Sequence, residues 1–209
     1  MIKQIDQYTF SRTNDHPLPY QMTNFLIHTL NYNVYIDSGL GTKALEELSL
    51  YAQSDKENVL ILSHHDYDHV WGSGALNFKS IYGHISINQR ILADTEQILV
   101  NQKYQEGSIQ IILADQLISK DTEIDDLVIL VSPGHTSDSL AVYDQRTKNL
   151  FIADNIGDQG CDLVPELEDR IAYKETLIKL MDYPIMAIYG SHRNMENASI
   201  LDIIMKSLT

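Results

Sequence analysis

The chain has 209 residues, which is long enough for one sizeable hydrophobic core, and we expect a single domain over residues 1–209. A hydrophobic content of 44% and a charged content of 21% are typical of a soluble globular protein, and no apolar run approaches the ~20 residues that cross a bilayer. The formal net charge of -14 argues against nucleic acid and anionic membranes as partners, because both carry negative charge themselves. A small-molecule substrate is the partner that we expect.

The N-terminus and the cysteine content indicate a compartment. The first twenty residues lack the continuous apolar core of a secretory signal, so we expect a cytoplasmic protein. Cys161 is the only cysteine, which excludes an internal disulfide and fits a reducing environment.

Short apolar runs rich in β-branched residues predict strands along most of the chain. They are NFLIHTL, NVYIDS, NVLILS, SIYGHI, IQIILA, DLVILVS, LAVYDQ, LFIAD and IMAIYG. Helical periodicity predicts helices at residues 42–53, 88–99, 167–181 and 197–208, the last one capped by Asn197. Strands interleaved with helices predict an α/β protein, and the first two runs, only two residues apart, predict an antiparallel hairpin within a mixed sheet.

Acidic residues and histidines follow several of these strands. The run NVLIL leads into SHHDYDH, which holds His64, Asp66, Asp68 and His69. Four more strand ends carry such residues, namely Asp37, His135, Asp154 and His192. Because ligands of open α/β sheets bind beyond the carboxyl ends of strands, these side chains are expected to converge.

Imidazole and carboxylate groups in this number predict a metal site, since they are the ligands of zinc, iron and manganese. His64 and Asp66 are two residues apart and share one side of an extended segment, whereas Asp68 and His69 follow at the turn. That division suits two metals with a carboxylate between them. The alternative is a set of buried, hydrogen-bonded residues without metal, and burying so many such groups side by side is very costly when they are unpaired.

These motifs resemble those of the metallo-β-lactamase superfamily. SHHDYDH is similar to its T-H-x-H-x-D-H signature, and SPGHTSDS, FIADN and YGSHR resemble its later histidine, bridging aspartate and final histidine. IDSGLG is similar to the I-D-T-G turn of the family, and the resemblance extends from about Thr23 to Arg193. It implies an α/β fold (α+β by some schemes), a four-layer αββα sandwich with mixed sheets.

The resemblance also implies a ligand set. One metal would be held by His64, Asp66 and His135, and the other by Asp68, His69 and His192. Asp154 would bridge the two, and catalytic roles fall to Asp68 and Asp154. The expected cofactors are two divalent metal ions, zinc first, with iron or manganese as alternatives.

Asp66 departs from the family pattern, because it stands where the family has its second histidine. A carboxylate is a harder ligand than imidazole and adds a negative charge, which favours iron or manganese more than an all-histidine site does. The flavodiiron branch similarly carries a carboxylate at this position.

Among the branches, the opening motif is most similar to that of glyoxalase II, T-H-H-H-W-D-H. Only a short tail follows His192, so the C-terminal helical domain that binds glutathione in that branch is not expected here. The resemblance implies a metallo-hydrolase that uses a metal-activated hydroxide on a small ester, thioester or lactone. The alternatives are a diiron protein that reduces oxygen or nitric oxide, and a non-catalytic metal-binding module.

Several other residues have two interpretations. Asp37 either orients a metal-bound histidine or only forms the turn before Gly39. Tyr67 and Trp71 either line a substrate pocket or belong to the core, with core packing favoured for Trp71. Arg193 either holds a substrate anion or lies solvated at the surface, the second being favoured. Residues expected to be structural or exposed are His16, His28, His65, His84 and Cys161.

Overall fold

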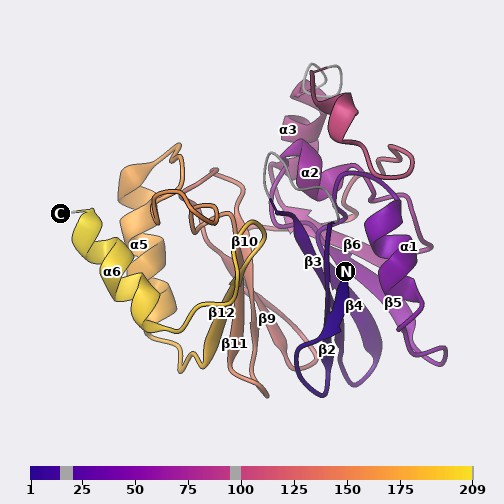
Figure 1. The fold of residues 1–209 in the computed structure, drawn as a ribbon, viewed down its shortest axis with the longest axis horizontal. Coiled ribbons are helices and arrows are strands. Elements are labelled where there is room, and N and C mark those ends of the chain that lie inside the picture. Colours follow the sequence, from indigo (N-terminus) through magenta and orange to yellow (C-terminus); the bar gives the residue numbers. More distant parts are fainter. Residues whose placement is uncertain (15–20, 95–99, 209) are drawn as a thin grey trace. The chain divides into compact units, whose positions relative to one another are not determined.

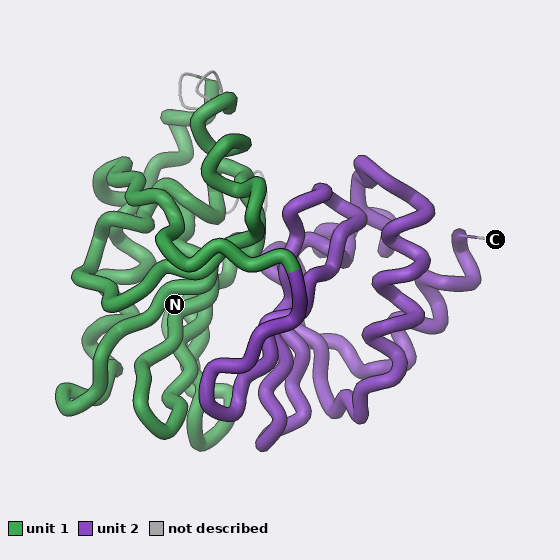
Figure 2. The backbone as a smooth tube through the Cα atoms, turned by 180° about the vertical axis from the view of Figure 1, so that it is seen from behind, with its two compact units in different colours: residues 1–15, 22–119 green, residues 16–21, 120–209 purple. Residues whose placement is uncertain are grey.

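Two mixed β-sheets, one in each of two units of the chain, form the framework of this protein (Figure 1 and Figure 2). The computed structural model describes residues 1–14, 21–94 and 100–208. Unit 1 consists of residues 1–15 and 22–119, and unit 2 consists of residues 16–21 and 120–209. The expected single domain over residues 1–209 stays a prediction.

The sheet of unit 1 has seven strands in sequence order. They are β1 (Ile2–Gln4), β2 (Thr9–Thr13), β3 (Thr23–His28), β4 (Tyr32–Ile36), β5 (Glu57–Ile61), β6 (Ser80–His84) and β7 (Gln116–Ile118). Strands β1 to β4 pair antiparallel, and β4 to β7 pair parallel. The predicted hairpin is therefore confirmed as β3–β4, and the sheet is mixed as expected.

Hydrophobic side chains on both faces explain the central place of β4 and β5. Tyr35 and Leu60 on one face, and Val34 and Val59 on the other, are all buried, and a parallel pair covered on both faces has this composition. Leu45 and Leu48 from α1 pack in the same cluster, together with Trp71, which confirms the core position favoured for that side chain. The helices of this unit are α1 (Lys43–Ser49), α2 (Tyr67–Val70), α3 (Ile87–Ala93) and the 3-10 helix η1 (Gln102–Tyr104).

The run IQIILA, predicted as a strand, is not a strand. The N–H of Gln110 donates to the carbonyl of Trp71 at 2.8 Å, and its carbonyl accepts from Gly74 N at 2.7 Å. The N–H of Ile112 donates to Ser73 Oγ at 2.8 Å. The alternating apolar side chains do pack on the core of unit 1, but the turn after α2 supplies the backbone partners that a neighbouring strand would otherwise provide.

The sheet of unit 2 has five strands in the order β12-β11-β10-β9-β8. They are β8 (Thr122–Ile124), β9 (Leu127–Val131), β10 (Leu140–Asp144), β11 (Asn149–Ala153) and β12 (Ala187–Gly190). Strands β11 and β12 pair parallel, and the other neighbours pair antiparallel. This sheet is mixed as well.

Two helices, α5 (Arg170–Met181) and α6 (Ser199–Ser207), cover this sheet (Figure 1). Tyr173 and Leu177 of α5 pack in one cluster with Ile204 of α6 and with Leu150 and Ile188 of the strands. All five side chains are fully buried. Burial at about 25 cal/mol per Å² of apolar surface is the main source of stability of such a layer.

The four predicted helices are present with shifted ends. The predicted helix at 88–99 corresponds to α3, and its part at 95–99 lies outside the described residues. Helix α5 begins later than predicted, because the side chain of Asp169 accepts hydrogen bonds from Ile171 N at 2.8 Å and Ala172 N at 3.0 Å. Ala198 holds the N-cap position of α6, and the predicted cap, Asn197, accepts from Ser199 N at 3.1 Å.

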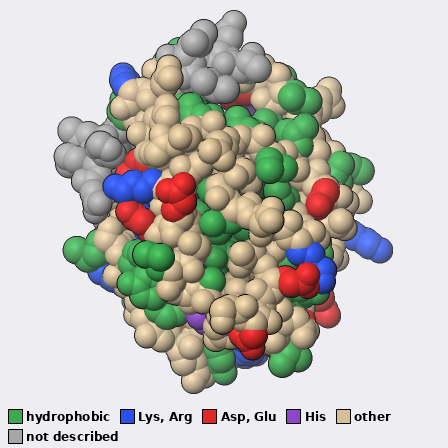
Figure 3. All heavy atoms as spheres, turned by 90° about the vertical axis from the view of Figure 1, so that its right-hand side faces the viewer, with side chains coloured by type: hydrophobic (Ala, Val, Ile, Leu, Met, Phe, Trp, Pro, Cys, Tyr) green, Lys and Arg blue, Asp and Glu red, His purple; other side chains and the backbone are tan. Residues whose placement is uncertain are grey.

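Among the described residues, no helix has the length and apolar character that a bilayer crossing requires. On the face shown in Figure 3, acidic side chains are scattered among neutral and hydrophobic ones, with basic side chains next to some of them. The acidic charge on that face is therefore spread out rather than gathered in one patch.

Replacing Asp169 tests the helix start. Asp169→Ala should lower the free energy of unfolding by about 1 kcal/mol, because two N–H groups of the first turn lose their acceptor. Asp169→Asn keeps a side-chain oxygen and should recover most of the loss, and Asp55→Ala, in an exposed turn, should change little. Urea unfolding followed by circular dichroism measures this; equal stability of Asp169→Ala and the parent would contradict the assigned cap.

Candidate metal centre

The segment after β5 carries four predicted ligands of unit 1. The chain leaves the strand at Ile61 and turns into α2, with Asp66 at the N-cap position in an extended conformation (φ -58°, ψ 145°). The side chains of His64 and His69 are fully buried, whereas that of Asp66 is 32% exposed. Burying two imidazoles at the end of an apolar strand requires a polar partner for each ring nitrogen.

Asp37 and Ser63 supply partners for the Nδ1 atoms of these two rings. Asp37 Oδ2 lies 2.8 Å from His69 Nδ1 and accepts from Ser63 Oγ at 2.8 Å. Ser63 Oγ lies 2.9 Å from His64 Nδ1. A carboxylate only accepts, so Nδ1 of His69 carries the hydrogen in its contact with Asp37. The Ser63 hydroxyl uses its hydrogen to donate to Asp37. The oxygen of Ser63 therefore accepts from Nδ1 of His64, which also carries its hydrogen. In both neutral rings, Nε2 then holds the lone pair that a metal needs.

Both interpretations of Asp37 apply to it. Its φ of +58° lies in the left-handed region, which short polar residues tolerate in turns. Its side chain, fully buried, also orients His69. The turn is packed against α2, because Ser38 N donates to His69 O at 2.8 Å and a Cβ added to Gly72 would meet the carbonyl oxygen of Gly41 at 2.3 Å.

The three predicted ligands of unit 2 follow β9, β11 and β12. His135 Nδ1 lies 2.9 Å from the carbonyl oxygen of Glu166, and His192 Nδ1 lies 2.6 Å from that of Gln21. Since a carbonyl oxygen only accepts, Nδ1 of both rings carries the hydrogen and Nε2 holds the lone pair. All four predicted histidine ligands thus have the same tautomer.

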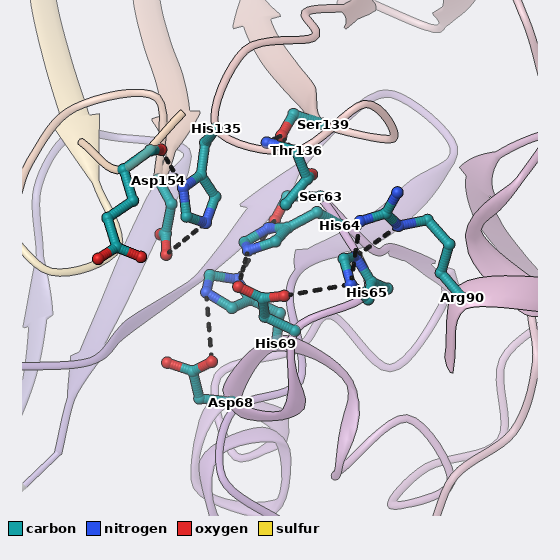
Figure 4. Close-up of polar contacts among 12 residues, drawn as sticks. Ser63, His64, His65, Asp68, His69, Arg90, His135, Thr136, Ser139 and Asp154 are labelled. Atoms are coloured by element: carbon teal, nitrogen blue, oxygen red, sulfur yellow. Dashed lines mark hydrogen bonds and ion pairs between the residues drawn. The ribbon is translucent and has the colours of Figure 1, made fainter. Parts of the chain in front are cut away.

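Each Nε2 atom faces a predicted carboxylate ligand of its own unit. Figure 4 shows this for His69 with Asp68 and for His135 with Asp154. In unit 1, His64 Nε2 lies 3.3 Å from Asp66 Oδ2, and His69 Nε2 lies 3.8 Å from Asp68 Oδ1. In unit 2, Asp154 Oδ2 lies 3.9 Å from His135 Nε2 and 3.1 Å from His192 Nε2. Two ligands of a tetrahedral zinc ion, each about 2.0–2.1 Å from it, lie about 3.3 Å apart. The donor types and spacings within each unit therefore fit a divalent metal.

Backbone strain precedes Asp154. Ala153 has a φ of +51°, and the pairing of β11 with β12 shifts register between Phe151 and Ala153. An alanine in the left-handed region costs roughly 1 kcal/mol, and such conformations gather at functional sites. The next residue, Asn155, is buried and bonds to the backbone of His135 (Oδ1 to N, 3.0 Å) and of Ser132 (Nδ2 to O, 2.6 Å).

The other histidines that the structure describes have different hydrogen-bond partners and are not predicted ligands. His28 Nε2 lies 3.0 Å from the carbonyl oxygen of Tyr51, and His84 Nδ1 lies 2.8 Å from Ser86 Oγ. His65 contacts Arg90 through both ring nitrogens. His16 lies outside the described residues.

Comparison with protein families agrees with this chemistry. The model of the metallo-beta-lactamase superfamily matches residues 21–192, which span both units and all seven predicted ligands. The chain belongs to the metallo-beta-lactamase superfamily. Solved structures show the fold: a metallo-beta-lactamase from Erythrobacter litoralis is 16% identical with a TM-score of 0.78 over 99% of this chain and 95% of that one. The predicted α/β fold of metallo-β-lactamase type with mixed sheets is confirmed.

Two further similarities refine the picture. A metallo-beta-lactamase from Pseudomonas aeruginosa, in a mono-zinc form, is 14% identical with a TM-score of 0.75 over 100% of this chain and 94% of that one. Hydroxyacylglutathione hydrolases of Legionella pneumophila, strains Corby and Paris, are 30% identical over 117 residues. That match covers 53% of this chain and 39% of the relatives, so the chain spans well under half of their length.

Some functional details of this superfamily member had no sequence signal. The carbonyl groups of Gln21 and Glu166 orient two histidines, but every residue has a carbonyl group. Ser63 and Asn155 adjoin predicted ligands, and that position was their only signal. Arg193 differs from both expectations, because Nη1 donates to the carbonyls of Gly157 at 2.8 Å and Asp158 at 2.7 Å and so braces a loop.

Removing the charge of Asp37 tests how the ring of His69 is held. Asp37→Asn should weaken binding of the metal held through His69 by about 10- to 100-fold, since an outer carboxylate fixes the tautomer of a ligating histidine. Competition with a chromophoric chelator measures the affinity. Asp6→Asn, which alters a carboxylate that accepts from two backbone N–H groups in a turn, is the matched control. Unchanged affinity in a folded Asp37→Asn variant would contradict the assignment.

Proposed function

We propose that this superfamily member is a metal-dependent hydrolase with two divalent ions, zinc being favoured over iron and manganese. One ion is assigned to His64, Asp66 and His135, and the other to Asp68, His69 and His192, with Asp154 between them. The observation that carries this proposal is the shared tautomer of the four histidines, each with Nδ1 bonded to a protein oxygen. Four histidines with only structural roles would not be expected to share one tautomer, with the lone pair of Nε2 directed toward a carboxylate in each case.

The two ions, when bound, supply an acidified water as nucleophile and polarise the oxygen of the substrate bond, since a zinc-bound water has a pKa of about 7. Side chains of the protein are assigned to accept the released proton and to position the nucleophile. Asp154, 13% exposed, is assigned as the acceptor of the proton that the nucleophile releases, and Asp68, almost fully buried, is assigned to hold the nucleophile in place. The buried hydrogen bonds of Asp37 and Ser63 keep two of the rings oriented meanwhile.

The charge of the proposed ligand set differs from that of a set with histidine at the position of Asp66. Two dications carry four positive charges and the three carboxylates carry three negative ones, which leaves one positive charge. With histidine in place of Asp66, two would remain. The lower charge acidifies a bound water less, so hydrolysis of activated bonds is favoured over that of unreactive ones.

The substrate class proposed is a small ester, thioester or lactone. The relatives from Legionella pneumophila are named for hydroxyacylglutathione, an acyl thioester, which supports this class and favours hydrolysis over the diiron redox alternative. The net charge of -14 supports small molecules over nucleic acid and anionic membranes as partners. A cytoplasmic location completes the proposal.

Metal analysis tests the ligand assignment. The protein purified without added metal and then saturated should contain two metal equivalents. Asp154→Ala and His192→Ala should each lose at least one, whereas His84→Ala, whose Nδ1 contacts Ser86, should retain both. Atomic emission measured after gel filtration reports the content. One equivalent at saturation would contradict the two-ion site.

Substrate profiling tests the proposed class. Small thioesters, esters and lactones should be cleaved by the zinc-loaded protein and not by Asp154→Ala measured in parallel. RNA should be cleaved poorly, because the acidic chain repels it. Efficient RNA cleavage together with inactivity on every acyl substrate offered would contradict the proposal.

A further inference from the structure

His65 contacts Arg90 of α3 (Figure 4). It also faces Asp66, the predicted ligand that departs from the family pattern. Arg90, from α3, places Nε 3.1 Å from His65 Nδ1 and Nη2 3.3 Å from His65 Nε2. His65 Nε2 lies 3.5 Å from Asp66 Oδ1. The side chain of His65 is 12% exposed, so this contact is largely shielded from solvent.

Arg90 alone does not fix the tautomer of His65, because a nitrogen of its guanidinium lies near each ring nitrogen. A carboxylate only accepts, so Nε2, which faces Asp66, is assigned the hydrogen of the neutral ring. Nδ1 then accepts from the Nε–H of Arg90. This is the opposite tautomer to that of the four histidine ligands, and it suits a ring that donates to a ligand rather than being one.

The two oxygens of Asp66 therefore have different neighbours. Oδ2 faces Nε2 of His64 at 3.3 Å, on the side of the donor set, and Oδ1 faces Nε2 of His65 at 3.5 Å. A carboxylate binds a metal with one or both oxygens, whereas the histidine of the T-H-x-H-x-D-H signature at this position offers one donor. An aspartate that is 32% exposed needs a partner to hold it in the one-oxygen geometry.

We propose that Arg90 and His65 are positioning residues that retain Oδ1 of Asp66, so that Asp66 presents Oδ2 alone to the metal. This inference rests on the proposed metal site. Through this pair, the carboxylate would take the place of a histidine and offer one oxygen to a bound metal, as suits a catalytic zinc of low coordination number. Without the pair, Asp66 would be able to turn and offer both oxygens.

Cobalt(II) in the full chain is the probe, because the intensity of its visible bands falls when a four-coordinate ion gains a ligand. His65→Ala should still bind two equivalents, but with weaker visible bands and an affinity changed by about tenfold or more at one site. His65→Gln keeps a side-chain N–H donor and should restore most of the parent spectrum. Arg90→Ala should shift the spectrum in the same direction as His65→Ala, by a smaller amount.

The same His65→Ala substitution made in an Asp66→His variant distinguishes a positioning role of His65 from a general structural role. In Asp66→His, no second oxygen exists, so adding His65→Ala should leave the cobalt spectrum unchanged. A His65→Ala variant with the parent spectrum and affinity would overturn the inference while the two-ion site stands. The same spectral change in both backgrounds would also overturn it. A parent protein that binds no cobalt would overturn the proposed function and this inference together.

Discussion

The hydrogen bond at Nδ1 of each predicted histidine ligand is the interaction on which the candidate metal centre depends. Asp37, Ser63 and the carbonyl groups of Gln21 and Glu166 each accept one such bond. These bonds satisfy one nitrogen of each imidazole, two of which are fully buried, and direct the other nitrogen toward a carboxylate. Rings held in this way need little reorganisation when a metal binds, so less binding free energy is lost to ordering them.

Several predicted ligands lie shortly after the ends of strands. His64 follows β5, Asp154 follows β11 and His192 follows β12, each at a carboxyl end. Strain is accepted at the same places, since Asp37 and Ala153 both have positive φ values. The charge of Asp66 adds a constraint of its own: a flexible carboxylate replaces a rigid ring, and the contacts of His65 and Arg90 offset that flexibility.

Much of the fold and of the candidate site could be predicted from the sequence, because strands and ligands leave local patterns. NVLIL is an apolar run in any context, and SHHDYDH is dense in donors. IQIILA shows where such patterns fail, because its alternation is real but its backbone partners come from the turn at Trp71 to Gly74. The carbonyl groups that orient His135 and His192, and the contact between Arg90 and His65 across 25 residues, depend on the folded chain and have no local signature.

Nitrogen-15 NMR of the metal-free protein tests the central claim most directly, because one-bond and long-range couplings of an imidazole ring report which nitrogen carries the hydrogen. At a pH where the rings are neutral, His64, His69, His135 and His192 should appear with the hydrogen on Nδ1, and His65 with the hydrogen on Nε2. Substitution of each histidine in turn assigns the signals. The account would be contradicted if two or more of the four carried the hydrogen on Nε2 or exchanged freely between the two forms.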